Sequence, residues 1–542
     1  MKNLLLILLI LFTSILSFSQ TDDWFWAVSA GGINPDKGNS ITVDTDDNII
    51  MTGTLGSSNI IFGTDTLTNA GVFIAKYDPS GNALWAKCAT GSSWAEGYDV
   101  TSDADNNIII TGEFSPPYII LGTDTLYTAT ANIWDNTDVF IVKYDPSGNL
   151  IWAKSAGGCA FEDGASVSSD ENNNIVVSGH FYSSFITFGT DTLYKCDSLF
   201  SPDIYIVKFD PMGNVLWAKS EGGSGWDNIK SITTDFNNNI ITMGRYPDST
   251  ITFGTDTFTN FGSDNIFIVK YDSLGDVLWA KKCSGGTYKE ITSDADNNYI
   301  ITGYFSTSTI TFGTEALTNA GSNNIFIVKF DTSGNVLWAK SAGGNNSDGS
   351  NSVTTDFNNN IIITGNFQSP IVTFGTDTIT NADSANIFIV KYDPSGNVLW
   401  AKSTGRGSAT SIISDLNNNV IIMGGFWSAS IAFGTTVLSN VSEGSYDIFI
   451  AKLNGSVGVF ENNVQDEIII YPNPANNNII IGNIAHNKDA IISIYDAQGQ
   501  MLFKQISQHG KTEIDVSGFV NGVYLIKFES PNLYKVGKFI KQ

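Results

Sequence analysis

The chain has 542 residues, of which 42% are hydrophobic, 12% aromatic and 15% charged. This composition excludes an intrinsically disordered protein, and the length allows two or three domains with sizeable cores. The 54 acidic residues outnumber the 28 basic ones and give a formal net charge of −26. Such a surface repels phosphate groups, so we expect neither nucleic acid nor anionic lipid as a partner.

Residues 1–19 have the pattern of a secretory signal peptide. Lys2 supplies a positive charge, residues 4–16 are an apolar run, and Ser17 and Ser19 are small residues suited to a cut after position 19. The apolar run is short for a membrane-spanning helix. We therefore expect cleavage rather than an uncleaved anchor, and a mature chain without a membrane span.

Residues 20–453 contain one unit that occurs seven times. Each unit holds strings close to SVTTDFNNNIIITG, ITFGTDTLTN, FIVKYD and LWAK. The period of roughly 60 residues and the lack of helical patterns favour an all-β repeat architecture. The tryptophan of the LWAK string recurs at Trp26, Trp85, Trp152, Trp217, Trp279, Trp338 and Trp400.

The sixth unit predicts four antiparallel strands, as in one propeller blade. A turn of three asparagines separates the first two strands, because Asn tolerates positive φ. A long connection with the string FGTDTITN follows, and a tight DPSGN hairpin joins the last two strands. The expected strands are residues 352–355, 361–367, 387–392 and 398–402.

Patterning indicates how these sheets pack. If Tyr392 pairs with Val398, both faces of the sheet are mainly apolar, so each sheet is expected to lie between two others. The recurring tryptophans, such as Trp400, are then expected in the core. The recurring lysines, such as Lys391 and Lys402, are expected to place their ammonium groups in water.

The ends of the repeat region indicate how it closes. The region begins with a lone fourth strand around residues 24–29 and ends with a third strand, residues 447–453. The N-terminal strand is therefore expected to complete the last sheet and to remove two free edges. The resulting prediction is an all-β, seven-bladed β-propeller of residues 20–453 closed by the N-terminal strand. A linear solenoid is the alternative.

The repeat resembles the SBBP-type β-propeller repeat family. The resemblance covers roughly residues 24–453 and rests on D-x-x-N-N-I-I-I-T-G and F-I-V-K-Y-D-x-x-G-N-V-L-W-A-K. It implies a fold and no particular ligand, because the family is defined by its repeats rather than by an active site.

Composition changes after residue 453. Residues 454–466 are interpreted as a linker, and residues 467–542 alternate short strands with Pro, Asn and Gly turns, which is typical of a small β-sandwich. An ordinary binding module of this type is one interpretation.

This segment also resembles the type A C-terminal sorting domain of the type IX secretion system. The resemblance implies export, contact with the type IX machinery, and a secreted, extracellular or outer-membrane surface location. It also implies removal of the domain after export. The residues that carry it include Tyr471, Pro472, Asn473, Pro474, Gly499, Gly522 and Tyr524.

The aspartates that precede the Asn-rich turns form the most regular acidic set. A ring of carboxylates could hold calcium, but each Asp is better placed to accept backbone N–H groups of its own turn. We therefore predict turn capping and no cofactor. The set is Asp44, Asp103, Asp170, Asp235, Asp294, Asp356 and Asp415.

Four tryptophans do not recur and are the candidate ligand-binding residues: Trp94, Trp134, Trp226 and Trp427. They fall in or beside connections, where an indole can stack on a sugar or anchor a protein, or can simply plug a loop. Cys159 and Cys196 lie in connections expected on one face, which suggests a disulfide between them.

Catalytic patterns are sparse. None of the three His residues has metal-ligand spacing, and no nucleophile elbow is present. We therefore predict a secreted or cell-surface, non-catalytic binding or adhesion scaffold with a glycan or protein ligand. A polysaccharide-degrading enzyme or accessory subunit, with a carboxylate pair among the many acids, is one alternative. A purely structural surface protein is the other.

Overall fold

The computed structural model describes residues 23–130, 136–196, 201–223, 225–246, 249–260, 265–381, 385–455, 469–482, 491–496, 500–506, 512–530 and 533–542. The predicted signal peptide, Trp134, Gly499 and most of the predicted linker lie outside these residues. The chain divides into two units, Met1–Gly458 and Val459–Gln542, which are described separately. Among the described residues, no helix has the length and apolarity needed to cross a membrane.

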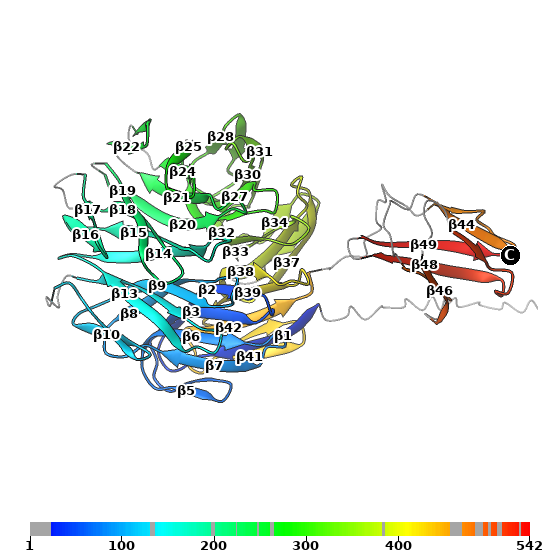
Figure 1. The fold of residues 1–542 in the computed structure, drawn as a ribbon, viewed down its shortest axis with the longest axis horizontal. Coiled ribbons are helices and arrows are strands. Elements are labelled where there is room, and N and C mark those ends of the chain that lie inside the picture. Colours follow the sequence, from blue (N-terminus) through cyan, green and yellow to red (C-terminus); the bar gives the residue numbers. More distant parts are fainter. Residues whose placement is uncertain are drawn as a thin grey trace, which may run out of the picture. The chain divides into compact units, whose positions relative to one another are not determined.

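In the described residues of the first unit, seven antiparallel sheets repeat one four-strand design (Figure 1). The first four strands of a sheet pair in chain order, except that β1 (Trp24–Ala30) is the fourth strand of the last sheet. The fourth strand of one sheet, β25 (Val277–Ser284), also pairs at Ser284 with Thr311 of a neighbouring hairpin. The first strands are β2 (Asp36–Val43), β8 (Ala95–Ser102), β14 (Glu162–Ser169), β20 (Asn228–Thr234), β26 (Thr287–Ser293), β32 (Asp348–Thr355) and β38 (Ser408–Ser414).

The second strands are β3 (Ile49–Leu55), β9 (Ile108–Phe114), β15 (Ile175–Phe181), β21 (Ile240–Tyr246), β27 (Tyr299–Phe305), β33 (Ile361–Phe367) and β39 (Val420–Phe426). The third strands are β6 (Gly71–Tyr77), β12 (Asp138–Tyr144), β18 (Asp203–Phe209), β24 (Asn265–Tyr271), β30 (Asn324–Phe330), β36 (Asn386–Tyr392) and β42 (Asp447–Leu453). The fourth strands are β7 (Ala83–Cys88), β13 (Leu150–Ala156), β19 (Val215–Glu221), β25 (Val277–Ser284), β31 (Val336–Ala342), β37 (Val398–Arg406) and, in the last sheet, β1 (Trp24–Ala30).

The sheets pack face to face, as the apolar patterning predicted. Tyr392 pairs with Val398, in the expected register. One core cluster joins Ile300 and Ile327 of one sheet to Ile363 and Val390 of the next. Burial on both faces explains why the second and third strands carry near-continuous Ile, Val and Phe, since neither face meets water. The first unit is therefore an all-β propeller built from repeated blades.

The FGTDT string forms a two-stranded hairpin within the long connection that we expected. Its Gly has positive φ (Gly375, 55°), which glycine adopts without steric cost. In each unit the hairpin links the second and third strands: β4 (Ile60–Phe62) with β5 (Asp65–Leu67), β10 (Tyr118–Leu121) with β11 (Asp124–Tyr127), β16 (Phe185–Phe188) with β17 (Asp191–Tyr194), β22 (Ser249–Phe253) with β23 (Asp256–Asn260), β28 (Thr309–Phe312) with β29 (Glu315–Thr318), β34 (Ile371–Phe374) with β35 (Asp377–Thr380), and β40 (Ser430–Phe433) with β41 (Thr436–Ser439).

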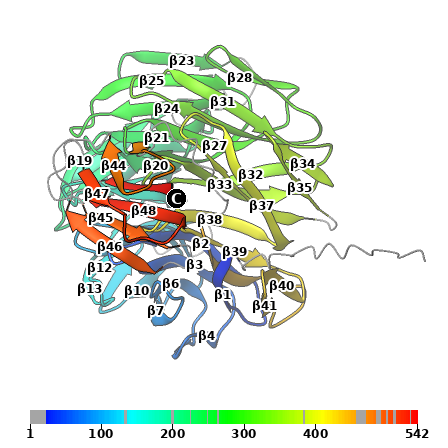
Figure 2. The same ribbon diagram turned by 90° about the vertical axis from the view of Figure 1, so that its right-hand side faces the viewer.

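The first and last sheets are in contact. The N-terminal strand β1 pairs with β42, and the order in that sheet is β1-β42-β39-β38. Ile41 of β2 donates its N–H to Ser411 Oγ of β38 at 3.3 Å. Figure 2 shows the corresponding blue and gold strands beside one another.

Each turn aspartate caps its own turn. Asp356 Oδ1 accepts the N–H groups of Asn358 and Asn360, both at 2.9 Å, which confirms the predicted capping. Its other oxygen lies 2.8 Å from Lys391 Nζ. The expectation of a solvated Lys391 ammonium is therefore wrong: the side chain is 6% exposed because a buried carboxylate, also bonded to Asn360 Nδ2, pairs with it.

The same buried pair occurs in every repeat within the described residues. The pairs are Lys76 with Asp44, Lys143 with Asp103, Lys208 with Asp170, Lys270 with Asp235, Lys329 with Asp294, Lys391 with Asp356, and Lys452 with Asp415. These carboxylates already have a cation and turn amides as partners, so they are not an open ring of calcium ligands.

The recurring tryptophans lie nearer the surface than predicted. Only Trp400 is buried, at 5% exposed, and the other six are half-buried. Trp338 donates its indole N–H to Pro394 O at 3.1 Å, in the turn of the following sheet. Each such indole therefore supports the neighbouring blade from its outer strand, which explains why the residue recurs.

The second unit contains two antiparallel sheets around one core. The sheets are β43 (Ile469–Tyr471), β44 (Asn478–Gly482) and β47 (Thr512–Asp515), and β46 (Met501–Ile506), β45 (Ile491–Tyr495), β48 (Gly522–Ser530) and β49 (Leu533–Lys541). Ile479 and Ile514 from the first sheet and Ile492 and Phe539 from the second share that core. Two layers with a common core are the arrangement of a β-sandwich.

The expected motif residues of this unit have structural partners. Asn473 Oδ1 accepts the N–H of Ile540 at 2.9 Å, and Tyr524 donates its hydroxyl to Val520 O at 2.6 Å. Pro472 and Pro474 follow cis peptide bonds beside the exposed Tyr471, and Gly522 opens β48.

Candidate functional site

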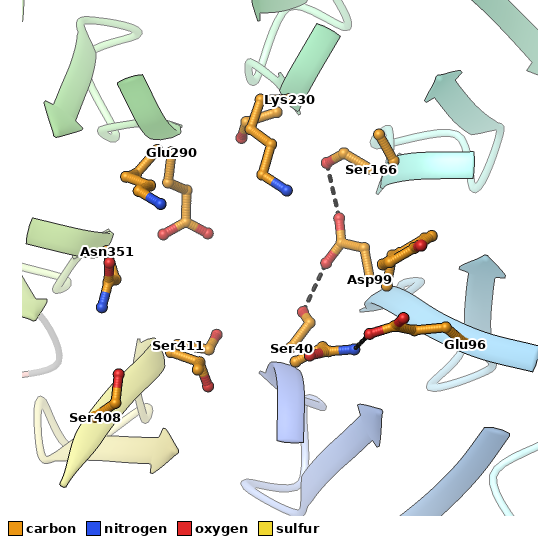
Figure 3. Close-up of a pocket in the computed structure, with 15 residues that line it drawn as sticks. Ser40, Glu96, Asp99, Ser166, Lys230, Glu290, Asn351, Ser408 and Ser411 are labelled. Carbon is orange, nitrogen blue, oxygen red and sulfur yellow. Dashed lines mark hydrogen bonds between the residues drawn. The ribbon is translucent and has the colours of Figure 1, made fainter. Parts of the chain in front are cut away.

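The first strands of the seven sheets line one polar cavity. Each of these strands contains a register shift of the kind a β-bulge produces. The extra residue of each bulge lines a central cavity of about 420 Å³ (Figure 3). These residues are Asn39, Tyr98, Ala165, Lys230, Lys289, Asn351 and Thr410.

The residue after each bulge joins its sheet to the next. In each case its side-chain oxygen accepts a backbone N–H from the following first strand; Val167 N, for example, lies 2.9 Å from Asp99 Oδ2. The acceptors are Ser40, Asp99, Ser166, Ser231, Glu290, Ser352 and Ser411. Five of these acceptors are serines. Asp99 and Glu290 are carboxylates at positions where a hydroxyl group makes the same hydrogen bond in the other sheets.

Asp99 is held on both oxygens. Oδ1 accepts the Ser40 hydroxyl at 2.6 Å, and Oδ2 accepts the Ser166 hydroxyl at 2.7 Å (Figure 3). Burial raises the pKa of the Asp99 carboxyl, and these hydrogen bonds only partly oppose that rise. A carboxylate with four donors around it is placed to join blades rather than to act on a substrate.

Glu290 is the second carboxylate of the cavity. Its Oε2 accepts the Ser352 hydroxyl and, at 2.7 Å, the N–H of Val353. Burial raises the pKa of Glu290 to about 7; Asp99 adds to the rise, while Lys230 opposes it. Figure 3 shows the Lys230 amine reaching between Glu290 and Asp99.

The central cavity is called the channel below. A second cavity of about 270 Å³ adjoins it, and Lys230 and Lys289 line both. Arg245 also lines it, and its described lining contains no Asp or Glu. Burial lowers the pKa of Lys289, and the neighbouring Lys230 lowers it further. This cavity of a protein with a net charge of −26 is therefore lined by three basic residues.

Aromatic side chains border the same cavity. Trp226 is 56% exposed and lies edge-on to Tyr182, with ring centroids 5.8 Å apart. Phe161, 46% exposed, packs on the other side of Tyr182 at 6.3 Å. Unlike the recurring tryptophans, Trp226 shows most of its indole to solvent, as a ligand-stacking residue must.

The other sequence-predicted tryptophans are dispersed. Trp94 is 45% exposed and lines a separate cavity of about 360 Å³, which shares Glu96 with the channel. Trp427 is half-buried against Tyr446, at 5.2 Å, with the Arg406 guanidinium 5.8 Å from its ring. Trp134 lies outside the described residues, and the other three tryptophans have different surroundings.

The predicted disulfide is absent. Cys159 and Cys196 are free and exposed. Different partners anchor the two loops: the Cys159 N–H donates to Ser183 Oγ, and the Cys196 N–H donates to Asp203 Oδ2. Polar anchoring thus fixes both loops without a covalent link.

The bulge residues are the functional candidates that sequence reasoning missed. Each stands five positions before the turn aspartate of its repeat, as Lys230 stands before Asp235 and Lys289 before Asp294. Aligning the repeats at those aspartates reveals one column in which side chains vary while the backbone geometry repeats. That column is the signal that could have found the channel lining.

Comparison with known proteins identifies the second unit. Residues 469–542 match the family described as a secretion system C-terminal sorting domain. The second unit is therefore a C-terminal sorting domain, as the sequence motifs predicted. The match covers the second unit only.

Two curated proteins are similar to this chain in sequence. The chain is 27% identical over 533 residues to an uncharacterised WD repeat-containing protein of Acanthamoeba polyphaga mimivirus, covering 79% of this chain and 38% of that protein. It is 24% identical over 188 residues to the regulatory protein FlaEY of Caulobacter vibrioides, covering 33% of this chain and 20% of that protein. The chain thus spans well under half the length of either relative.

Solved structures with a similar fold include the Dos1 propeller, at a TM-score of 0.40 and 8% identity over 81% of this chain and 98% of that one. They also include PorZ, a surface component of the type-IX secretion system of Porphyromonas gingivalis, at a TM-score of 0.26 and 11% identity over 95% of this chain and 75% of that one. Assignment of the repeats to the SBBP type stays a prediction.

Proposed function

We propose that the seven sheets form one closed ring of seven blades. Two series of hydrogen bonds support this, because both continue from the last sheet to the first. At the bulges, Ser411 accepts from Ile41. At the turns, the Leu416 N–H donates to Asp47 Oδ1 at 2.7 Å, as the Phe357 N–H donates to Asn418 in the preceding pair. A closed ring has no free edge strand.

We further propose that this ring is a non-catalytic glycan-binding scaffold, exported through the type IX secretion system to the cell surface or the extracellular space. The sorting domain supports the route, with release or surface attachment after its removal. The observation that carries the binding role is the exposed Trp226 at the mouth of the central channel. Its indole is one wall of a cavity, where it can stack on a sugar ring while neighbouring polar groups bond hydroxyls.

The acids of the channel favour binding over hydrolysis. A glycosidase needs one carboxyl free to protonate the leaving group and another free to attack or to activate water. Asp99 instead accepts three hydrogen bonds from neighbouring strands and one from the N–H of Val100 on its own strand. Glu290, with its pKa near 7, has the proton affinity of a general acid. The third carboxylate of the cavity lining, Glu96, accepts a hydrogen bond from the Asn39 amide, and the experiment below therefore also tests for hydrolysis.

Glycan-array binding by the purified chain tests this function. Saturable binding to a sugar class is expected, with roughly a two- to tenfold loss in Trp226→Ala, since stacking on an aromatic ring contributes about 0.5–1.5 kcal/mol. Phe357→Ala is the matched control, because Phe357 is 65% exposed at the opposite end of the channel. Equal binding by all three proteins, or sugar hydrolysis that Glu290→Gln abolishes, would reject the proposal.

A further inference from the structure

The cavity beside Trp226 has a charge opposite to that of the protein as a whole. Acidic residues outnumber basic ones 54 to 28 in the chain, yet Lys230, Lys289 and Arg245 line this cavity and no described lining residue is acidic. Neither lysine forms an ion pair with any described residue. The positive charges of Lys230 and Lys289 disfavour one another, and an anion between the two lysines relieves that repulsion.

Nearby acids are already engaged elsewhere. Asp163 Oδ1 lies 2.9 Å from His180 Nδ1, and Glu113 accepts the hydroxyls of Tyr98 and Thr137. Glu290 and Asp99 line the central cavity but not this one. Both lysines line both cavities. Lys230 opposes the rise in the Glu290 pKa, whereas Lys289 Nζ lies 5.5 Å from the centre of the Tyr304 ring.

Backbone features make the cavity and fix its cations. Lys230 and Lys289 are the bulge residues of adjacent strands, β20 and β26, and a bulge re-aims the residue that it inserts. The connection before β26 is only Gly285 and Gly286, both with positive φ, whereas five residues, 157–161, precede β14. The short connection leaves this part of the channel mouth uncovered.

The wall opposite the cations is aromatic and rigid. Tyr182 supports the Trp226 ring edge-on, and the Tyr288 hydroxyl donates to Asn228 O at 3.1 Å, which ties β26 to β20. An exposed indole face beside two ammonium groups suits a ring that is apolar on one face and anionic at its edge. A sugar that carries a carboxylate or a sulfate has this combination.

We propose that this cavity binds an acidic sugar unit of a polysaccharide, with Lys230 and Lys289 pairing with its carboxylate or sulfate and Trp226 stacking on its ring. The inference rests on the proposed glycan-binding function and names its ligand class. At about 270 Å³ the cavity is smaller than most drug-sized sites, which begin near 300 Å³. It therefore accommodates one sugar unit, while the rest of the polysaccharide lies over the open mouth of the channel.

Calorimetric titration of the full chain with trigalacturonate, and with a sulfated galactan trisaccharide, tests the proposal. The fully methyl-esterified trigalacturonate and the unsulfated galactan trisaccharide are the neutral controls with the same rings. We expect each acid to bind at least about tenfold more tightly than its neutral control, because hydrogen bonds to charged groups contribute more than neutral ones. Raising the salt concentration should weaken only the binding of the acids.

Variants separate charge from stacking. Lys230→Gln with Lys289→Gln should remove the preference for acids while residual neutral binding persists, and Trp226→Ala should weaken both. Lys282→Gln, an exposed lysine at the end of β25, is the control and should bind like the wild type. Thermal unfolding of each variant verifies that the fold is intact.

Each remaining outcome is decisive. Equal affinity for acids and neutral controls would overturn the acidic-sugar inference and leave the proposed glycan-binding function in place. Binding of the acidic sugars that persists in the double lysine variant would also overturn it, because other residues would then bind the carboxylate or sulfate. No binding to either acid would overturn it as well, and the glycan array then decides the wider function independently.

Discussion

The channel has a turn end, at the Asn-rich turns, and a bulge end, at the bulges of the first strands, and the two ends differ in how much their side chains vary. At the turn end, every repeat carries the same Asp, Asn and Lys, and each buried Asp is paired with a Lys, as Asp356 is with Lys391. At the bulge end, the corresponding residues differ from sheet to sheet, and the charges gather in a few of them. Identical side chains at one end stabilise every blade in the same way, whereas the side chains at the other end differ from blade to blade.

The pKa shifts have opposite signs at the two ends. At the turn end, burial raises the pKa of Asp44, Asp170 and Asp235, but hydrogen bonds from Lys and Asn outweigh it and the net shift is downward. At the bulge end, burial prevails, and the pKa of Glu290 rises to about 7. The turn end therefore stabilises the fold when ionised, and the bulge end costs stability when ionised.

The largest expected effect separates two lysines. Lys391→Ala leaves the buried Asp356 without its cation and should lower the free energy of unfolding by about 3–5 kcal/mol. Lys230→Ala removes an exposed bulge-end lysine and should change it by less than about 0.5 kcal/mol. Urea unfolding followed by tryptophan fluorescence measures both. Similar losses from the two changes would contradict the division between a structural and a variable end.

The second prediction concerns pH. A carboxyl whose pKa is raised in the folded state stabilises the fold fully below its unfolded pKa, near 4.5 for Glu290, and loses that contribution as the pH rises to about 7. Between these pH values the wild type should lose about 1–3 kcal/mol of unfolding free energy through Glu290, and Glu290→Gln should not show this loss. Urea midpoints between pH 4.5 and 8 measure it.

Glu171→Gln is the control for that experiment, because Glu171 is exposed at the turn end. Its stability profile should follow that of the wild type. A Glu290→Gln profile that falls as steeply as the wild type's between pH 4.5 and 7 would show that Glu290 ionises freely in the folded protein.

The smallest effect tests the hydrogen bonds between turns. Asn297 has φ 59° and accepts the Phe236 N–H at 2.9 Å. Asn297→Ala loses the acceptor and strains the backbone, which should cost about 1–2 kcal/mol, whereas Asn297→Gly loses only the acceptor and should cost about half of that. Chemical unfolding compares the two. If neither variant is destabilised, the turns do not hold adjacent blades together.

Local patterns predicted most of the fold. The DPSGN hairpin is consistent with the pairing of Tyr392 with Val398 that was assumed from the sequence, and the D-x-x-N-N string predicted the capped turn, because both depend on neighbours in the chain. The Pro, Asn and Gly motifs likewise identified the sorting domain before any coordinates. The FGTDT hairpin was missed, since the string was assigned only to a long connection between the second and third strands.

The sequence alone determined an all-β repeat protein with an export signal pattern and a sorting domain, because periodicity and turn chemistry are local properties. Only the tertiary structure decided what the recurring lysines and the irregular residues do. Lys391 pairs with Asp356, and Lys230 lines the same cavity as Lys289 of the next sheet. The residues of each pair lie too far apart in the sequence for a local pattern to connect them. The candidate site is a property of that assembly, since each sheet contributes one bulge residue and none forms the cavity by itself.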